Sequence, residues 1–333
     1  RSTPKPSSAA SDVYKRQDNM GMKDRTPATL EEYSDYKVRF NNWDRWGKED
    51  QFGTLNHITE DTTKYAVNLV SNGKTISCAN PLATEAMVPD LGRNGKPADH
   101  NMAITKTNSS DYIGVSYHGF VNTHIDALCH FFTNTTDEDG RLYNDRDPAL
   151  VTEGGALTNS VENWRNGILT RGVLYDIPKM RGTDYVTIDD PVHGWDLEDW
   201  AKSVNITPRD GDAVLVRSGH DQYWAANGPS KEPYPPQTPG NSPTIVEYLY
   251  DTNASLLGWD LQESEFKPHP YPGRTPIHQI IIPHMGMPIL DNANFDQLAE
   301  HCAKTGRYEF LLIIAPLIVQ GGTGSPVNPL ATF

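Results

Sequence analysis

The chain has 333 residues, which is close to the upper limit for one continuous hydrophobic core. Its 43 acidic and 29 basic residues give a net charge of −14, which argues against a nucleic acid or a membrane surface as partner because both are anionic. The mean hydropathy of −0.59 and the lack of a long apolar run exclude a membrane span, and three cysteines without a CxxC pair indicate a reduced, cytoplasmic protein.

Residues 1–17 are set apart by their composition. They are rich in Ser, Pro and basic residues, they lack the apolar stretch of a secretory signal, and they resemble a string that arises when sequencing-adapter DNA is translated. We expect a non-native or disordered tail there. We expect a single domain over residues 18–333.

The remaining chain divides into short predicted elements by apolar periodicity and by turn residues. In chain order, the first half contains helix 29–40, a turn-rich segment 41–59, helix 62–72 ended by Gly73, strand 74–83, and strands 101–107 and 112–126, which we expect to pair antiparallel. The second half contains helix 160–167, strand 171–178, helix 197–204, strand 212–219, helix 243–251, strand 254–260, helices 276–282 and 295–306, and strand 309–319.

The order of these elements predicts the fold class. Helices and strands are mixed without strict alternation, which favours a mixed-sheet α/β or α+β domain over a doubly wound parallel sheet. The Pro-rich run 227–243 has the composition of a linker between domains. We interpret it as a long surface loop, because the segments on its two sides have similar composition.

The segment SYHGFVNTHIDALCHFF, residues 116–132, contains most of the candidate metal-binding and catalytic residues. It places three histidines and an aspartate within thirteen positions: His118, His124, Asp126 and His130. In an extended strand alternate side chains share a face, so the first three can point the same way. A single histidine of this kind is more often a packed core residue. Three histidines together with one carboxylate form a ligand set that Zn²⁺ or Mn²⁺ accepts, and this set predicts a metal site.

Two other hydrolase types are disfavoured. Cys129 precedes His130, but neighbours on a strand point to opposite faces, so this pair is poorly placed to activate a thiolate. We predict that Cys129 is a small buried core residue. The chain has no GxSxG motif, which argues against a serine hydrolase of the α/β type.

THIDALCHF resembles the core of the HxGTHxDxPxHF signature of the cyclase family, which includes kynurenine formamidase and isatin hydrolase. The resemblance continues in the family's order from about residue 40 to the end, and it is strongest to the longer members. Further similar segments are WGKEDQFGTLN (46–56), RGVLYDI (171–177), PRDGDAVLVRSG (208–219), LLGWD (256–260), PIHQIIIPHMGMPILDN (276–292) and GGTGSPVNPLA (321–331).

The resemblance implies a swivelling β/β/α-type fold, one or two divalent ions (Zn²⁺ or Mn²⁺), a small-molecule substrate and a homodimer or homotetramer. It also implies hydrolysis of an amide or ester carbonyl. His124 and Asp126 match the family's metal ligands, and His130 matches its general base. His278 lies near the later histidine ligand, and Asp291 falls where many members have a glutamate ligand.

The chain departs from the family pattern at three positions. Phe120 stands where the short signature has a histidine, and His118 can replace that ligand if the HGFVNTH run is a two-residue expansion. Asp291 is one methylene shorter than glutamate. His278 precedes Gly286 by eight residues rather than by the seven of the shorter members.

Two function hypotheses follow. The first is a metal-dependent hydrolase of an amide, cyclic amide or ester, with arylformamidase activity (N-formylkynurenine to kynurenine and formate) as the precedent. In this hydrolase the metal lowers the pKa of a bound water and His130 acts as general base. A metal-dependent cyclisation or dehydration is a variant of the same hypothesis. The second is a non-catalytic ligand-binding protein with a decayed metal site. Convergence of His118 and His278 on Asp126 would favour the first.

Overall fold

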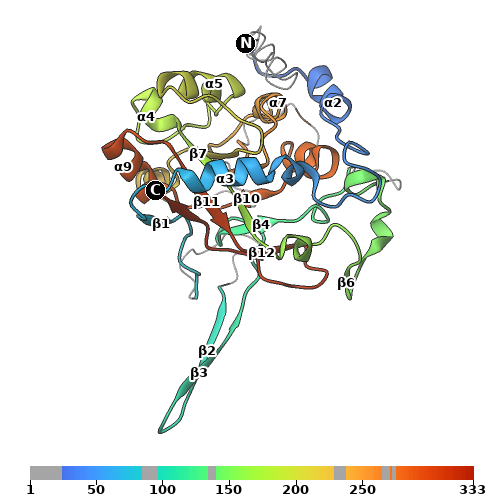
Figure 1. The fold of residues 1–333 in the computed structure, drawn as a ribbon, viewed down its shortest axis with the longest axis vertical. Helices are drawn as coiled ribbons and strands as arrows, with labels where there is room; N and C mark the ends of the chain where they lie inside the picture. The colour runs from blue at the N-terminus through green and yellow to red at the C-terminus, as the bar shows by residue number, and fades with distance from the viewer. Residues whose placement is uncertain (1–24, 85–96, 134–139, 229–237, 265–270, 272–274) are drawn as a thin grey trace, which may run out of the picture.

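The computed structural model describes residues 25–84, 97–133, 140–228, 238–264, 271 and 275–333. Within these residues the chain builds a nine-stranded mixed sheet in the order β1-β13-β11-β7-β8-β9-β10-β4-β12 (Figure 1). The strands are β1 (Thr75–Ser77), β4 (His124–Asp126), β7 (Ile168–Asp176), β8 (Ala213–Arg217), β9 (Leu256–Trp259), β10 (Ile289–Asp291), β11 (Glu309–Ile314), β12 (Gly324–Pro326) and β13 (Leu330–Thr332).

The centre of the sheet is parallel and its two sides are antiparallel. Strands β7, β8, β9 and β10 run in one direction, whereas β1, β13 and β11 on one side and β4 and β12 on the other are joined antiparallel. The parallel strands are almost continuously buried, as expected for strands whose two faces are both covered. Gly258 on β9 allows close packing, because a Cβ there would lie 2.7 Å from a methyl group of Leu215.

Helices cover the sheet. Helix α3 packs on β7 and β11, and α5 packs on β7, α4 and α7. None of the helices in the described part of the chain combines the length and apolar content needed to cross a membrane. The helices are α2 (Leu30–Arg39), α3 (Glu60–Asn68), α4 (Ile177–Arg181), α5 (Gly194–Ser203), α6 (His220–Asn227), α7 (Ile245–Asp251), α8 (His278–Ile280) and α9 (Asp296–Thr305). Single helical turns are η1 (Gly53–His57), η3 (Tyr143–Asp145), η4 (Pro148–Leu150), η5 (Val161–Trp164) and the π-turn η6 (Ile281–Met285).

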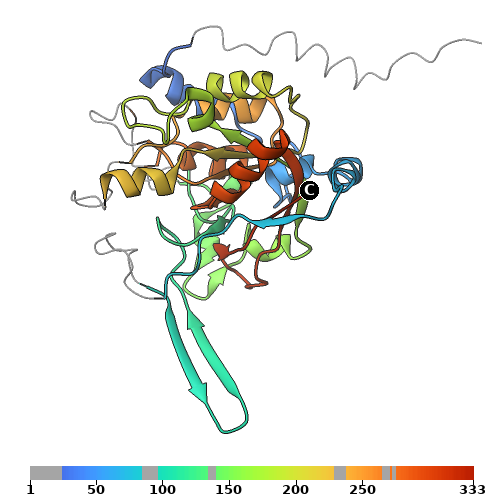
Figure 2. The same cartoon turned by 90° about the vertical axis from the view of Figure 1, so that its left-hand side faces the viewer.

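A long β-hairpin stands away from the sheet. It consists of β2 (Asp99–Ile104) and β3 (Ser109–Gly114), and it projects from one end of the molecule in both views (Figures 1 and 2). A much smaller hairpin is formed by β5 (Val151–Thr152) and β6 (Gly155–Ala156).

The mixed α/β fold class is confirmed, and several boundaries are corrected. The helix predicted over 62–72 ends at Asn68, before the glycine expected to stop it, and the helix predicted over 160–167 is only the turn η5. The strand predicted over 112–126 is interrupted, because β3 ends at Gly114 and β4 begins at His124. The tail 1–17 lies outside the described residues, as does most of the Pro-rich run.

Candidate metal centre

Strand β4 presents His124 and Asp126 on one face, as the alternation of side chains predicts. Both side chains are buried. Pairing of β4 with β10 sets Asp291 directly opposite His124 in the antiparallel register. The Nε2 atom of His124 lies 3.3 Å from Asp126 Oδ1 and 3.8 Å from Asp291 Oδ2. Three residues of the predicted ligand set are therefore brought together by one pair of short strands.

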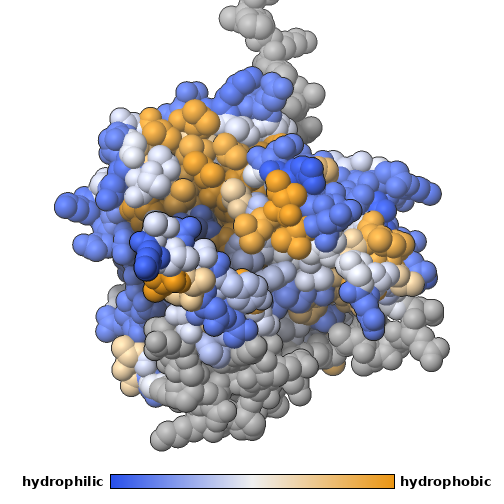
Figure 3. Space-filling view, turned by 90° about the horizontal axis from the view of Figure 1, so that it is seen from below, coloured by the Kyte–Doolittle hydropathy of each residue, from blue (hydrophilic) through white to orange (hydrophobic). Residues whose placement is uncertain are grey.

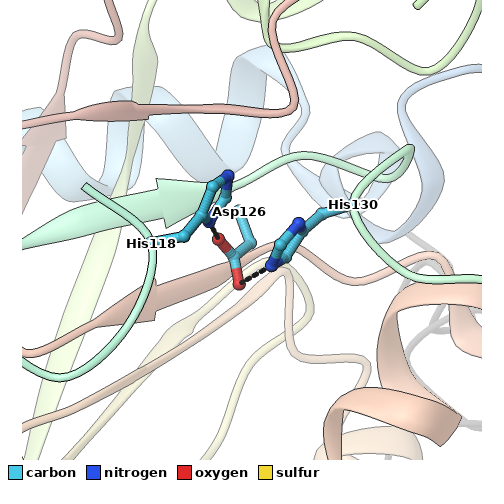
Figure 4. Close-up of side chains that lie close together, drawn as sticks. All are labelled: His118, Asp126 and His130. Carbon is cyan, nitrogen blue, oxygen red and sulfur yellow. Dashed lines mark ion pairs between the residues drawn. The ribbon is translucent and has the colours of Figure 1, made fainter. Parts of the chain in front are cut away.

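His118 reaches the same place by a different route from the one predicted. It lies in the irregular segment between β3 and β4, not on a strand, and Gly119 with φ +119° turns the chain immediately after it. The Nδ1 atom of His118 is 2.9 Å from Asp126 Oδ1 (Figure 4). The Nε2 atom of His118 is 2.9 Å from the hydroxyl of Thr323. His118 therefore does not lie on the face of a continuous strand, contrary to the prediction, although it does contact Asp126.

His130 completes this side of the centre. Its Nε2 atom is 3.8 Å from Asp126 Oδ2, and its ring stacks on the ring of His118 with centroids 3.8 Å apart (Figure 4). Burial lowers the pKa of His130 to about 4, and the charge of Asp126 only partly offsets this. The imidazole is therefore neutral near pH 7 and able to accept a proton.

His278, the first residue of α8, also reaches Asp126. Its Nε2 atom lies 3.4 Å from Asp291 Oδ2 and 3.8 Å from Asp126 Oδ2. Its Nδ1–H donates to Glu263 Oε1 at 2.7 Å, which leaves Nε2 free to face the centre. Burial opposes protonation of His278, but the charges of Glu263 and Asp291 outweigh burial and raise its pKa well above the ordinary value.

The carboxylate of Asp126 is the feature that calls for a cation. Its side chain is 1% exposed, and neither oxygen accepts a well-aligned hydrogen bond from a described residue. Burial alone would raise the pKa of Asp126, but the neighbouring His130 and His124 hold it well below its ordinary value. A buried, ionised carboxylate without hydrogen bonds is costly unless a positive charge compensates it.

Two groups of potential ligands share this carboxylate. One is His118, Asp126 and His130, and the other is His124, Asp126 and Asp291; within each group the ligand atoms lie within 4.8 Å of one another. Imidazole nitrogens with carboxylate oxygens form a donor set that Zn²⁺ and Mn²⁺ accept. The residues therefore fit one divalent ion, or two bridged by Asp126.

Several residues that orient the ligands were not identified from the sequence. Glu263 and the carbonyl oxygen of Asn122 hold the Nδ1 atoms of His278 and His124, at 2.7 Å and 2.8 Å respectively. Asp291 accepts from Gln262 Nε2 at 2.9 Å and from the indole N–H of Trp259. The available signal was the polar pair Gln262 and Glu263, which stands three and four residues after the end of the buried strand β9 at Trp259.

Cys129 lies beside the centre without taking part in it. Its side chain is buried, and burial raises the pKa of the thiol to about 12. A thiol with that pKa is not a nucleophile near neutral pH. Cys129 is therefore the small core residue that the sequence predicted.

The comparisons with known proteins show the family and the fold. Residues 54–265 match a protein family described as "Putative cyclase". A solved structure described as a novel cyclase is 26% identical, covers 89% of this chain and 99% of its own, and has a TM-score of 0.76.

Two isatin hydrolases share the fold at lower identity. Isatin hydrolase A from Labrenzia aggregata, bound to benzyl benzoate, is 19% identical over 78% of this chain and 93% of its own, with a TM-score of 0.54. An isatin hydrolase bound to the product analogue thioisatinate is 18% identical over 82% of this chain and 98% of its own, with a TM-score of 0.53. No curated protein sequence matches the chain.

Proposed function

The chain belongs to the cyclase family, whose pattern matches residues 54–265, and from this premise we propose that it is a metal-dependent hydrolase of an amide, cyclic amide or ester. The observation that carries the proposal is the buried carboxylate of Asp126, which lacks aligned hydrogen bonds and is surrounded by four imidazoles. The reaction class follows from what such a centre does to a carbonyl group and to water.

The ion would be held by five residues: His118, His124, Asp126, His278 and Asp291. A divalent ion such as Zn²⁺ or Mn²⁺ would polarise a substrate carbonyl and lower the pKa of water. His124 and His278 are prepared for this role, because each has its Nδ1 atom engaged by a neighbour and turns Nε2 towards the centre.

His130 is the proposed general base. Its Nε2 atom is 3.8 Å from Asp126 Oδ2, beyond hydrogen-bonding distance, so its lone pair is available to take a proton from water and return it to the leaving amine or alcohol. The charge of Asp126 would stabilise the imidazolium that forms. Replacing His130 by Asn should lower kcat about 10²–10⁴-fold, the usual contribution of a general base, while leaving metal content unchanged. Loss of the metal in that variant would instead make His130 a ligand.

The substrate proposed for a first test is an aromatic formamide. The ring centroid of Phe131 lies 4.8 Å from that of His130 and 5.0 Å from that of His278. The ring centroid of Tyr117 lies 4.6 Å from that of His118. Such rings can pack against a planar substrate. Hydrolysis of N-formylkynurenine and formyl-anilides should be compared with that of lactones and cyclic amides. Activity confined to the last two classes would refute arylformamidase specificity while preserving the hydrolase proposal.

The alternative of a non-catalytic binding protein rested on Phe120 and on the short side chain of Asp291. The convergence of the ligands supports the hydrolase instead, because His118 contacts Asp126 and Asp291 lies within 3.8 Å of both His124 and His278.

A further inference from the structure

His118 is carried by a part of the chain that has no regular structure of its own. It lies between β3, which ends at Gly114, and β4, which begins at His124. Its Nδ1 atom nevertheless faces the carboxylate of Asp126 at 2.9 Å (Figure 4). A ligand on a free loop would have to be ordered when the ion binds, at a cost in conformational entropy. Contacts from outside the ligand set are therefore needed to hold this segment in place.

The side-chain amide of Asn292 supplies two such contacts. Asn292 directly follows Asp291, the last residue of β10. Its Nδ2 atom donates to the backbone carbonyl of Gly119 at 2.5 Å and to that of Asn122 at 3.1 Å. A side-chain amide has two N–H donors, so each is used once. The side chain of Asn292 therefore ties the end of β10 to the segment between β3 and β4.

The two carbonyl groups are those that adjoin histidine ligands. Gly119 directly follows His118, so fixing its carbonyl holds the backbone beside that ligand. The carbonyl of Asn122 accepts the Nδ1–H of His124 at 2.8 Å, and this bond sets which nitrogen of the ring faces the centre. One amide thus steadies the backbone that carries His118 and the acceptor that orients His124.

Gln262 adds a third donor and reaches a third ligand. Its Nε2 atom donates to the same Gly119 carbonyl at 3.1 Å and to Oδ2 of Asp291 at 2.9 Å. The backbone carbonyl of Asn292 in turn accepts from the hydroxyl of Thr123 at 2.6 Å. We call the side chains of Asn292 and Gln262 the clamp. The clamp connects the ligand at the end of β10 to the segment that carries the histidines.

The clamp lies in the interior of the protein. Hydrophilic side chains normally gather at the surface, as they do beside the apolar clusters on the face shown in Figure 3. Asn292 and Gln262 are instead 4% and 8% exposed. A buried amide is costly unless its polar atoms are paired, so the hydrogen bonds of the clamp account for amides at these two positions.

The backbone at Asn292 shows what the side chain adds. Asn292 has φ +52°, in the left-handed region that asparagine and glycine adopt most readily. Glycine would serve the turn equally well, but it would offer no donor to Gly119 or Asn122. The variant Asn292→Gly therefore removes one amide of the clamp and leaves the turn unstrained.

We propose that the clamp positions the metal ligands, by holding His118 and His124 in the places from which they bind the ion. The proposal rests on the metal-dependent function proposed above and deepens it. It also accounts for the departure at Phe120, where the short signature has a histidine. The longer HGFVNTH run needs a tether to return His118 to Asp126, and the clamp supplies that tether.

The test is a competition titration of apo-protein and a chromophoric chelator with Zn²⁺. Asn292→Gly should weaken Zn²⁺ binding about 10–100-fold, the usual loss when a partner that orients a metal ligand is removed. Asn253→Gly is the matched control. Asn253 is also buried, has φ +49° and donates from Nδ2 to Asp210 at 2.9 Å, but it precedes β9, whereas Gln262 follows it. The control should bind Zn²⁺ like wild type.

A double-mutant cycle separates positioning from a general loss of stability. Because Asn292 acts through His118, the loss of affinity caused by Asn292→Gly should shrink at least about threefold in a His118→Ala background. His278 is held by Glu263 instead, so the full loss should remain in a His278→Ala background.

Gln262→Leu is a second variant that leaves the turn at residue 292 untouched. It should also weaken Zn²⁺ binding about tenfold or more, because it removes the donor to Gly119 and one donor to Asp291. The circular dichroism spectrum of each apo-variant should match that of wild type.

Two outcomes would overturn the proposal. One is wild-type affinity for Zn²⁺ in both Asn292→Gly and Gln262→Leu. The other is an equal loss from Asn292→Gly in the His118→Ala and His278→Ala backgrounds, because the clamp would then not act through His118. Both outcomes leave the hydrolase proposal standing, whose own failure would be a protein that binds Zn²⁺ and hydrolyses none of the substrates named above.

Discussion

Glu263 offers a sharp test of how the metal centre is held. Its Oε1 atom accepts both the backbone N–H and the Nδ1–H of His278, each at 2.7 Å, and the carboxylate is buried. The variant Glu263→Gln keeps an acceptor oxygen of nearly the same shape but removes the negative charge. His278 should then keep its position, while its Nε2 atom becomes a weaker electron donor.

The expected loss of metal affinity follows from the role of residues that hydrogen-bond to a metal ligand. Removing a partner that orients and polarises a histidine ligand typically lowers metal affinity 10–100-fold, which corresponds to about 1.4–2.7 kcal/mol. Glu263→Gln should lie at the lower end of this range, because the hydrogen bonds survive in neutral form. An alanine at this position should approach the upper end, since both donors of His278 lose their acceptor.

The assay is a competition titration of apo-protein and a chromophoric chelator with Zn²⁺, which gives the Kd of each variant. Glu309→Gln is the matched control. Glu309 also accepts a short charged hydrogen bond, from Arg171 at 2.7 Å, but it lies on β11, away from the centre. The control should bind Zn²⁺ like wild type. An unchanged Kd in Glu263→Gln and Glu263→Ala would refute the reasoning, because His278 would then not need its carboxylate partner.

Two further predictions concern stability. Burial lowers the pKa of His193 to about 4 in the folded protein, whereas its pKa in the unfolded chain is near 6.5. The unfolded state therefore binds the extra proton first as the pH falls, and the free energy of unfolding should drop by up to about 3 kcal/mol between pH 6.5 and pH 4. Urea unfolding of His193→Asn should show a shallower drop over the same pH range. Arg171 is buried and paired with Asp212 at 2.6 Å, so Arg171→Met should cost about 3–5 kcal/mol by leaving a buried carboxylate without its partner, and adding Asp212→Leu should recover part of that loss in the same assay. A loss in Arg171→Met below 1 kcal/mol would contradict this account of the pair.

Most of the longer apolar elements could be predicted from the sequence, and three of the short strands could not. Strands β7, β8 and β9 and helices α5, α7 and α9 lie where periodicity placed them. Strands β10, β12 and β13 are three residues long, which is too short to carry a period. They exist because a neighbouring strand pairs with them, and such long-range pairing leaves no local mark in the sequence.

In the candidate site too, local features could be predicted from the sequence, whereas features that depend on tertiary contacts could not. Alternation correctly put His124 and Asp126 on one face of β4, because that property is local to a strand. The position of His118 depends on the turn at Gly119 and on its bond to Thr323, which are tertiary features. Glu263 belongs to no motif, and only the fold reveals that it holds His278.

The measurement that tests the central claim most directly is the metal content of protein purified without chelators, determined by elemental analysis. Wild type should contain about one or two equivalents of Zn or Mn, and His124→Ala should lose them, because His124 is buried with Nε2 facing two carboxylates. His220→Ala is the control, since His220 pairs with Asp221 outside the centre and its loss should leave the metal in place. Wild-type protein that holds no metal even after reconstitution at neutral pH would contradict the account.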